Sequence, residues 1–412
     1  MGHTRGSPFA TVRGMVQRLR ERVRVRPPRP RRLIPLLWGT TNFADCWAAL
    51  WYIARPWHLV RGPAIAEYEN AFAQSAGVRF GVSFASGRVG LYGILRSLGI
   101  GPGDEVLLQV PTHVVVADAV RYTGARPVFV DCQRETFNMD LSRAEQAAGP
   151  HTRAIVLQHT FGVPADIDGA QSLARRRNLF LIEDCVHALG ARYRGRPAGS
   201  FGIAAFYSTE ETKVISSMMG GMAVTNDGEL ARKLRVFQEG CAWPSATISA
   251  RYIAKIVLYH FAGSPWLHPY TFPIYTRLRR AGRISLSPSP TSGEEQLGLK
   301  PRNYERRLSN AQAAIALRQL RRLDANVTHR RAIAALYERR LAQAGMPVIQ
   351  NGPNVEPSYL RYPVWVEDPD AAQRRWRHGR SWASGSGRSS RKRPPRLRWG
   401  TRKGRALWRR RS

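Results

Sequence analysis

Short apolar runs alternate with helical patterns along the middle of the chain, and this alternation restricts the fold more than any other feature. A repeated order of strand and helix predicts an α/β fold with a mainly parallel sheet and helices on both of its faces. In such sheets a ligand lies beyond the carboxyl ends of the strands. The predicted strands cover residues 106–108, 127–130, 154–158, 180–183, 204–207 and 222–225.

Two chemically distinctive residues follow two of these predicted strands. Asp184 ends the buried run 179–184, and Lys213 lies five residues after Ser208 in a polar turn, shortly before Gly220. Pyridoxal phosphate (PLP) needs an amine that holds its aldehyde as a Schiff base and an acid that keeps its ring nitrogen protonated. A carboxylate at a strand end, followed by a Ser-x-x-x-x-Lys turn, therefore predicts two parts of a PLP site.

A glycine-containing turn upstream is a candidate for the phosphate of this cofactor. Ser86, Gly87 and Arg88 follow the apolar run 80–83 and open a helical pattern that ends at Gly99. The N-terminus of a helix attracts anions, because its first N–H groups are free and its dipole is positive there. The position of the turn supports this interpretation, because it lies one strand-helix unit before the next predicted strand.

Seven stretches carry a further signal through their order along the chain: 86–91, 101–106, 124–131, 158–166, 183–191, 220–227 and 308–314. With these motifs the chain resembles, from about Gly62 to Leu341, the DegT/DnrJ/EryC1/StrS aminotransferases. These are PLP enzymes of fold type I (aspartate-aminotransferase-like) that often aminate nucleotide-linked keto-sugars. The resemblance implies a mainly parallel seven-stranded sheet flanked by helices, a smaller α/β domain after it, and a homodimer.

The resemblance also implies a role for the residues around the cofactor ring. Lys213 would hold the cofactor and, once the substrate releases it, move a proton between Cα and C4′. Asp184 would pair with the ring nitrogen, and His187 would lie near the ring oxygen. His113 matches the position at which a planar side chain stacks on the ring. The structural alternatives are a solvated turn lysine at 213 and a packing histidine at 187.

The same resemblance assigns the phosphate end of the site. Ser208 matches the family's phosphate-binding serine, and Ser86, Gly87 and Arg88 form the turn whose backbone N–H groups would bind the same phosphate. Many relatives have threonine at position 88, so the Arg88 guanidinium either reaches the phosphate or pairs elsewhere.

Glu305 departs from the family pattern. Relatives often have an asparagine here that reaches the partner subunit's phosphate, with an arginine two residues later that matches Arg307. A carboxylate would repel a phosphate. Glu305 therefore points away, or this subgroup holds the phosphate differently.

The formal net charge of +35 lies mostly at the two ends of the chain. Residues 1–34 hold ten arginines and one glutamate, and residues 374–412 hold sixteen Arg or Lys and no acid. Such a charge ordinarily favours a nucleic-acid partner. Because the excess lies outside the predicted core, we expect no specific nucleic acid. Two interpretations of the basic ends remain open. They form an arm that binds RNA or a membrane surface, or they lie outside the folded domain.

The composition changes abruptly after Gln373. From there on the chain contains no Val, Ile, Met, Phe, Tyr or Cys, so it cannot bury enough apolar surface to offset its ordering entropy. Before this point, residues 358–366 are predicted as a strand of the smaller domain and 368–373 as the start of its next helix. We therefore predict a shift of the reading frame near codon 373. A genuine disordered basic tail is the alternative.

A chain of 412 residues can bury a large core and divide into two domains. The segment that least resembles the family is rich in aromatic residues and proline. It could form a lid over a bulky acceptor, a dimer contact, or a patch at a membrane surface through residues 252–283. The predicted parts are a basic, disordered extension (1–34), a large PLP-binding domain (35–300) with this insertion (about 241–300), the beginning of a smaller domain (301–373) and a basic tail (374–412).

Neither end of the sequence predicts export. Residues 1–32 lack the apolar core of a signal peptide, and no run approaches the roughly 20 apolar residues of a transmembrane helix. The four cysteines have no metal-ligand spacing. We therefore expect a cytoplasmic protein with reduced thiols and no metal.

The predicted function is transfer of an amino group from an amino-acid donor, expected to be glutamate, to a keto-sugar. We expect the sugar to be nucleotide-linked and to serve cell-surface polysaccharide or secondary-metabolite biosynthesis. Two alternatives remain open. One is a catalytically impaired or regulatory protein that kept the PLP fold, and the other is a basic nucleic-acid-binding protein.

Overall fold

The computed structural model describes residues 40–281, 299–349, 351–366, 368, 398–402 and 405–409. They belong to two units, one formed by Met1–Arg339 with Ile349–Pro363 and the other by Arg340–Val348 with Val364–Ser412. The first unit contains all the predicted site residues. In the second, β11 (Arg398–Arg402) pairs antiparallel with β12 (Arg405–Arg409). The predicted N-terminal extension and residues 369–373 of the helix start predicted at 368–373 lie outside the described residues.

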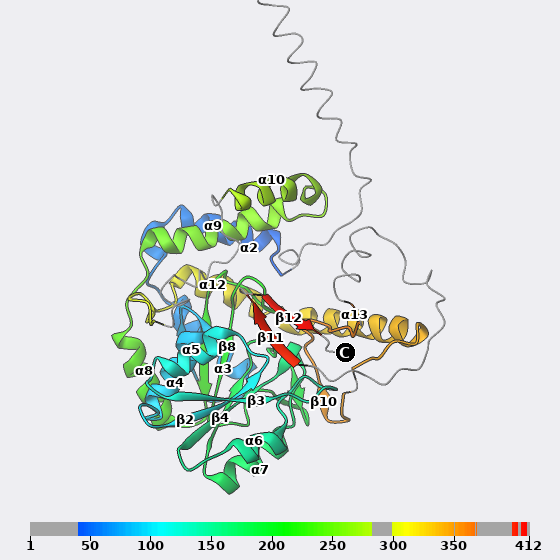
Figure 1. Ribbon diagram of the computed structural model, residues 1–412. Helices are drawn as coiled ribbons and strands as arrows, with labels where there is room; N and C mark the ends of the chain where they lie inside the picture. The colour runs from blue at the N-terminus through cyan, green and yellow to red at the C-terminus, as the bar shows by residue number, and fades with distance from the viewer. Residues whose placement is uncertain are drawn as a thin grey trace, which may run out of the picture. The chain divides into compact units, whose positions relative to one another are not determined.

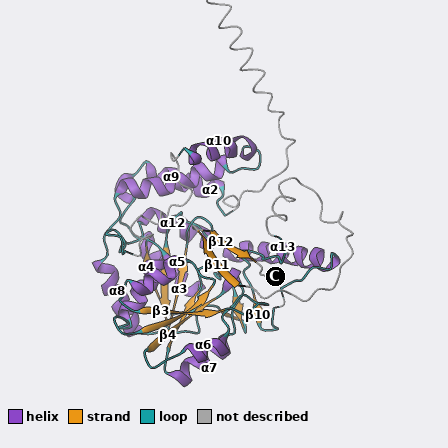
Figure 2. Ribbon diagram, viewed as in Figure 1, coloured by secondary structure: helices purple, strands orange, loops and turns teal. Residues whose placement is uncertain are grey.

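A seven-stranded sheet forms the centre of the first unit (Figures 1 and 2). Its order is β1-β9-β8-β5-β4-β2-β3, in which the last five strands are parallel and β9 runs antiparallel to both neighbours. The prediction of a mainly parallel sheet is confirmed, and each predicted strand lies within an observed one. The strands are β1 (Phe80–Phe84), β2 (Glu105–Val110), β3 (Arg126–Asp131), β4 (Thr152–Gln158), β5 (Phe180–Asp184), β8 (Ala204–Ser208) and β9 (Gly221–Thr225).

Both faces of this sheet are covered by helices, which is why its strands are nearly continuous apolar runs. Successive strand residues point to opposite faces, so Val106 and Leu108 join one core cluster and Leu107 joins another. On the first face lie α4 (Gly87–Ser97), α5 (Val114–Arg121) and α8 (Gly228–Gly240). On the other lie α3 (Ala64–Ser75), α6 (Leu141–Ala147), α7 (Ile167–Arg177) and α12 (Asn310–Leu320).

A layer of helices lies at one end of the unit, with α12 between this layer and the sheet (Figure 1). It consists of α2 (Phe43–Ile53), η1 (Pro56–His58), α9 (Ala246–Ala262) and α10 (His268–Arg280). The chain also forms η2 (Thr160–Gly162), the long helix α13 (Leu323–Gln343) and a small sheet of β6 (Arg192–Tyr193), β7 (Arg196–Pro197) and β10 (Val355–Glu356). Among the described helices, none is long and apolar enough to cross a membrane.

The predicted strand at 358–366 is wrong, because these residues form bends and extended loop. Their backbone groups are taken by partners outside any sheet. The N–H of Ser358 donates to the carbonyl of Gly162, and the N–H of Arg361 donates to that of Phe161. The guanidinium of Arg330 donates to the carbonyl of Leu360. The segment therefore lies against the η2 turn instead of extending a sheet.

Candidate active site

The predicted site residues gather where β5 and β8 end, as expected for a ligand site of a parallel sheet. Asp184 is the last residue of β5, and Ser208 is the last residue of the neighbouring strand β8. His187 follows β5 after a short turn, and Lys213 lies in the loop that connects β8 to β9. Topology thus brings four chemically different side chains to one edge of the sheet.

Lys213 is partly buried and lies in an environment that disfavours its charge. Burial lowers the pKa of its amine, the carboxylates of Glu210 and Asp184 oppose this change, and Arg361 adds to it. Loss of the charge leaves a lone pair on the nitrogen, which is the form that reacts with an aldehyde. The location therefore suits an amine nucleophile better than a solvated lysine.

Asp184 is 1% exposed and accepts a hydrogen bond of 3.1 Å from the N–H of Val186. Burial raises its pKa to about 6, although Lys213 and His159 act in the opposite direction. A buried carboxylate is costly without a cationic or N–H partner. A protonated ring nitrogen of a bound cofactor would supply that partner.

His187 also lies beside Lys213. Burial lowers its pKa to about 3, and the nearby Lys213, Arg361 and His113 act in the same direction. The imidazole is therefore neutral at physiological pH, with one N–H to donate. Its Nδ1 atom is buried and finds no hydrogen-bond partner among the described residues. Such an atom is available to a bound ligand.

The N-terminus of α4 approaches the end of β8 closely. A Cβ atom placed on Gly87 would lie 2.8 Å from the carbonyl oxygen of Tyr207 and 3.2 Å from Cβ of Ser208. Glycine is therefore required for this approach. Ser86 is the N-cap residue of α4, and its side chain makes no capping hydrogen bond. The helix N-terminus and the Ser208 hydroxyl thus lie close together, and both groups can bind an anion.

Arg88 and His113 lie at the margins of this arrangement. The guanidinium of Arg88 lies 5.9 Å from the ring centre of Tyr304, whose hydroxyl donates to the carbonyl of Arg88. The exposed His113 caps α5, and its Nδ1 accepts a hydrogen bond of 3.3 Å from the N–H of Val115. It is close enough to His187 to influence that residue's pKa.

Glu305, which departs from the family pattern, forms an ion pair with Lys300 at 2.7 Å. Arg307 donates to the backbone carbonyls of Cys241 and Glu239. Both side chains therefore have partners within this chain.

Side-chain amides from α12 and α13 hold the loop that carries Lys213, and sequence reasoning assigned them no role. Gln319 exchanges hydrogen bonds with the backbone of Ser216. Gln312 donates to the carbonyls of Ser217 and Met219, at 3.2 and 2.7 Å. Asn326 donates to the carbonyl of Val214. Their spacing of seven residues, which places them on one side of a helical segment, was the sequence signal that could have indicated this role.

A buried pair beside the site is structural. His159 Nδ1 accepts from the N–H of Ala165, so its Nε2 carries the proton and donates to Glu183 at 3.0 Å. Three backbone N–H groups also donate to Glu183, and its pKa is lowered despite complete burial. Cys185 lies close to both residues. The hydrogen bonds already satisfy the two side chains without a metal.

Arg361 is a residue of the site that sequence reasoning missed. It influences the pKa values of both Lys213 and His187, so its charge lies near both. The segment before it is fixed to the site, since the hydroxyl of Ser358 donates to the carbonyl of His187 at 3.2 Å. We expected a strand at 358–366, and the sequence of a strand does not indicate which arginine faces a ligand.

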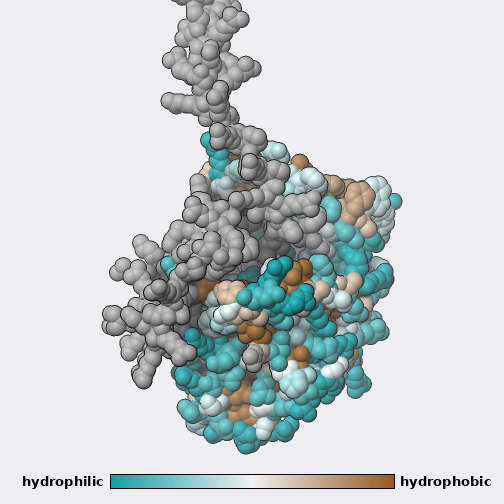
Figure 3. All heavy atoms as spheres, turned by 90° about the vertical axis from the view of Figure 1, so that its right-hand side faces the viewer, coloured by the Kyte–Doolittle hydropathy of each residue, from teal (hydrophilic) through white to brown (hydrophobic). Residues whose placement is uncertain are grey.

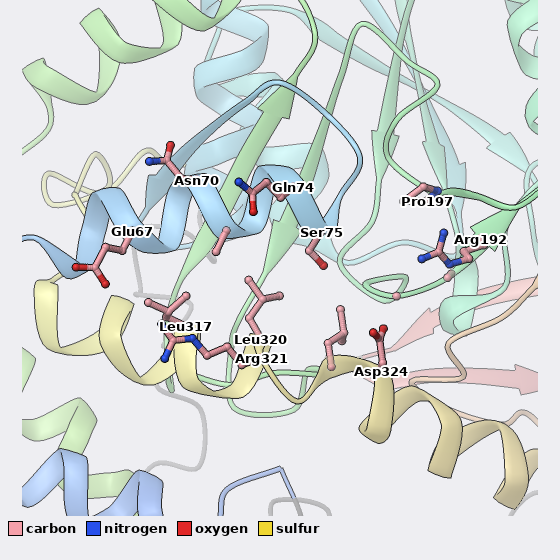
Figure 4. Close-up of a pocket in the computed structure, with 14 residues that line it drawn as sticks. Glu67, Asn70, Gln74, Ser75, Arg192, Pro197, Leu317, Leu320, Arg321 and Asp324 are labelled. Carbon is pink, nitrogen blue, oxygen red and sulfur yellow. The ribbon is translucent and has the colours of Figure 1, made fainter.

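A surface cavity of about 740 Å³ lies away from these residues, between α3, α12 and the turn around β6 and β7 (Figure 4). Glu67, Gln74 and Arg321 are among its lining residues, and none of the predicted site residues lines it. Its size therefore does not identify the chemical site.

The side chains present fit PLP. An amine with a lowered pKa, a buried acid and a buried imidazole nitrogen without a partner lie within reach of one another. A helix N-terminus and a serine hydroxyl lie at the neighbouring strand end, where the phosphate would bind. Lys213, Asp184 and Ser208 would hold the aldehyde, ring nitrogen and phosphate, respectively.

Comparisons with known proteins agree with this arrangement. GDP-perosamine synthase of Caulobacter vibrioides is 34% identical over 284 residues, which are 69% of this chain and 63% of that protein. The UDP-N-acetyl-3-dehydro-alpha-D-glucosamine 3-aminotransferase of Acidithiobacillus ferrooxidans is 43% identical over 176 residues, or 42% of this chain and 48% of that protein. The chain thus spans less than two thirds of the length of these curated relatives.

A solved structure and a family profile extend the similarity. The crystal structure of S. venezuelae DesV in complex with a ketimine intermediate has a TM-score of 0.62 and 29% identity, and the match covers 82% of this chain and 77% of that chain. The profile of the DegT/DnrJ/EryC1/StrS aminotransferase family matches residues 47–257 and 275–376. The chain therefore belongs to the DegT/DnrJ/EryC1/StrS aminotransferase family.

Proposed function

We propose that this protein is a PLP-dependent aminotransferase that moves an amino group from an amino acid to a keto-sugar. The family depends on PLP, which supplies the aldehyde and the electron-withdrawing ring. The observation that carries the proposal is that Lys213, whose pKa is lowered, lies near enough to the buried Asp184 at the end of β5 for each to influence the other's pKa.

Each side chain has a defined task in this proposal. With the cofactor bound, Lys213 would hold its aldehyde carbon and would later carry the proton between two carbon atoms. Asp184 keeps the ring nitrogen protonated, and His187 donates its N–H to the ring oxygen. Ser208 and the turn at 86–88 fix the phosphate, which orients the ring against Lys213.

The substrate class follows from the relatives and from the charge of the site. A GDP-linked and a UDP-linked sugar appear in the names of the two relatives, which supports a nucleotide-linked keto-sugar as acceptor. Glutamate is the proposed donor. Arg361 adds a positive charge beside Lys213 and suits an anionic group of either substrate.

The proposed working unit is a cytoplasmic homodimer, as expected from the sequence. The proposed domain division and the frame shift near codon 373 also stand as proposals, and the family match ends at residue 376. Resequencing the locus tests the shift. An intact reading frame through codons 365–385 would contradict it.

The test of function is a half-reaction followed by absorbance. The purified protein, loaded with PLP, is mixed with glutamate, and we expect loss of the long-wavelength absorbance together with formation of 2-oxoglutarate. Adding nucleotide-linked keto-sugars should restore the absorbance. Lys213→Ala is the variant that should do neither, and Lys233→Ala is its matched control on the surface helix α8. A cofactor-loaded wild type that leaves every amino donor unchanged would contradict the proposal.

A further inference from the structure

The layer of α2, η1, α9 and α10 presents an unusually apolar surface to solvent. Of the 21 exposed large hydrophobic side chains among the described residues, 13 lie on this layer or on the turn between α9 and α10. Figure 3 shows hydrophobic residues at the surface at the height of α9 and α10. The side chains are Phe43, Trp47, Leu50, Trp51, Ile53, Trp57, Leu258, Phe261, Trp266, Leu267, Tyr270, Phe272 and Ile274.

Helix α2 is apolar on two different faces. Its buried face, which includes Ala49, packs into a core cluster with Ile253 and Ile315. Its outward face carries Phe43 and Trp47, which are 66% and 67% exposed. A surface helix of a globular protein is normally polar on the outward face. A second apolar face therefore indicates a second apolar environment.

Helices α9 and α10 continue this surface. Leu258 and Phe261 point away from the buried face of α9, which contains Ile253 and Ile256. Tyr270 and Ile274, one helical turn apart on α10, are 66% and 61% exposed. Contiguous apolar patches of this kind mark an interaction site.

The charges on this surface have one sign. Residues 242–281 contain no Asp or Glu and five Arg or Lys. In residues 40–62 the one acid is Asp45, which is buried and paired with Arg318 and Arg322. Arg55 lies over the ring of the exposed Trp51 at 4.3 Å. The apolar surface is therefore accompanied by cations that no acid of these segments neutralises in solvent.

We propose that this surface, the α2–α9–α10 face, binds the surface of an anionic lipid bilayer. Exposed Trp, Phe and Leu enter the boundary between head groups and acyl chains, while Arg and Lys pair with anionic head groups. Because none of the described helices can cross a membrane, the helices lie in the plane of the interface.

A second copy of the chain is a poorer partner for this face. In a two-fold dimer the same surface patch lies on both sides of the interface. Two copies of the α2–α9–α10 face would bring the exposed Arg251 and Arg277 together with the same cations of the second copy, and residues 242–281 offer no acid to pair with them. Anionic lipid supplies the opposite charge and the apolar phase together.

The inner side of the layer contacts the loop that carries Lys213. Met218 of this loop shares a core cluster with Ile253 and Ile256 of α9. Glu211, two residues before Lys213, lies close enough to Tyr259 of α9 for each to influence the pKa of the other. Binding through the outer side would therefore place the catalytic loop one helix layer from the lipid surface.

Vesicle flotation with the full-length protein tests this proposal. We expect the wild type to float with vesicles of phosphatidylglycerol and phosphatidylcholine, and about tenfold less with phosphatidylcholine alone. The triple variant Trp47→Ser/Tyr270→Ser/Ile274→Ser should lose flotation by about tenfold or more. The matched control, Phe129→Ser/Val236→Ser/Ile333→Ser, removes exposed apolar side chains elsewhere and should float like the wild type.

Several results would overturn it. The wild type could stay in solution with anionic vesicles, or the triple variant could float as well as the wild type. The third contradicting result combines two measurements. The wild type fails to float, and light scattering shows that the triple variant becomes monomeric. The face would then bind a second copy of the chain. Circular dichroism and retained PLP absorbance establish that each variant is folded, and none of the substituted residues belongs to the proposed active site.

Discussion

The side-chain amide of Gln319 exchanges two hydrogen bonds with the backbone of Ser216: its Oε1 accepts from the N–H at 2.7 Å, and its Nε2 donates to the carbonyl at 2.9 Å. Ser216 lies three residues after Lys213, and both partners of this contact are buried. The backbone N–H and C=O groups of a loop lack the hydrogen-bond partners that a strand or a helix provides, and here the glutamine amide supplies them. Helix α12 therefore fixes the loop that carries Lys213, the proposed catalytic amine.

Replacing this amide should cost stability and activity together. In Gln319→Leu two buried backbone groups of Ser216 lose their partners, so we expect the free energy of unfolding to fall by about 1–3 kcal/mol. Urea unfolding measures this change, and the spectrum with PLP reports the position of Lys213. Arg321→Leu, on the exposed side of the same helix end, is the control. Unchanged stability in Gln319→Leu would show that the two hydrogen bonds are not needed.

Asp184 should be essential for cofactor binding. Asp184→Asn keeps the size of the side chain and removes its negative charge, so the ring nitrogen loses its counter-ion. We expect PLP affinity and turnover to fall roughly 100-fold, as when one partner of a buried charge pair is removed. Spectral titration with PLP measures the first effect. Asp131→Asn, at the exposed end of β3, should behave like the wild type.

The sheet could be predicted from the sequence, and candidate site residues at its edge could be proposed, because both depend on local patterns. A run such as 154–158 is buried on both faces and leaves an unambiguous signal. Lys213 and Asp184 could be proposed because an amine and an acid at two successive strand ends have few other uses. The order of the strands in the sheet could not be predicted from local patterns, because β9 lies between β1 and β8 and β1 is distant from it in the sequence.

Long-range contacts could not be predicted. The bends at 358–361 replace the expected strand because Arg330 and the η2 turn take their backbone groups. Arg361 enters the site for the same reason. In the sequence, Arg361 alternates with apolar residues as a polar residue of an edge strand does. Its proximity to Lys213 arises only in the folded chain.

Arg361 should govern the binding of an anionic substrate. We expect Arg361→Ala to raise KM about tenfold or more, since charge-assisted hydrogen bonds contribute about 1.5–3 kcal/mol. Arg361→Lys should recover part of this loss. Measuring the two half-reactions separately distinguishes a donor carboxylate from the diphosphate of a nucleotide-linked sugar. If neither half-reaction responds to Arg361→Ala, its charge serves another purpose.

Glu211 should make stability fall as the pH rises. Burial raises its pKa to about 8, whereas the unfolded chain ionises near 4.5. The folded state thus keeps a proton that the unfolded state loses, so this contribution is complete below pH 4.5 and disappears as the pH approaches 8. Asp184, with its pKa of about 6, acts in the same direction over a narrower range.

Comparing Glu211→Gln with the wild type isolates this effect. The variant cannot ionise at this position, so its advantage in the free energy of unfolding should grow by about 1–3 kcal/mol between pH 5 and pH 8. Urea unfolding of the cofactor-free proteins at both pH values measures it. Parallel pH profiles would mean that the Glu211 carboxyl ionises normally in the folded protein.

The most direct measurement is the identification of the lysine that binds PLP. The wild type is loaded with PLP, reduced with borohydride, digested and analysed by mass spectrometry. We predict a pyridoxyl group on the peptide that contains Lys213, and loss of that adduct in Lys213→Ala. An adduct on Lys233 or Lys255 instead, or no adduct in folded protein supplied with PLP, would contradict the assignment of this site.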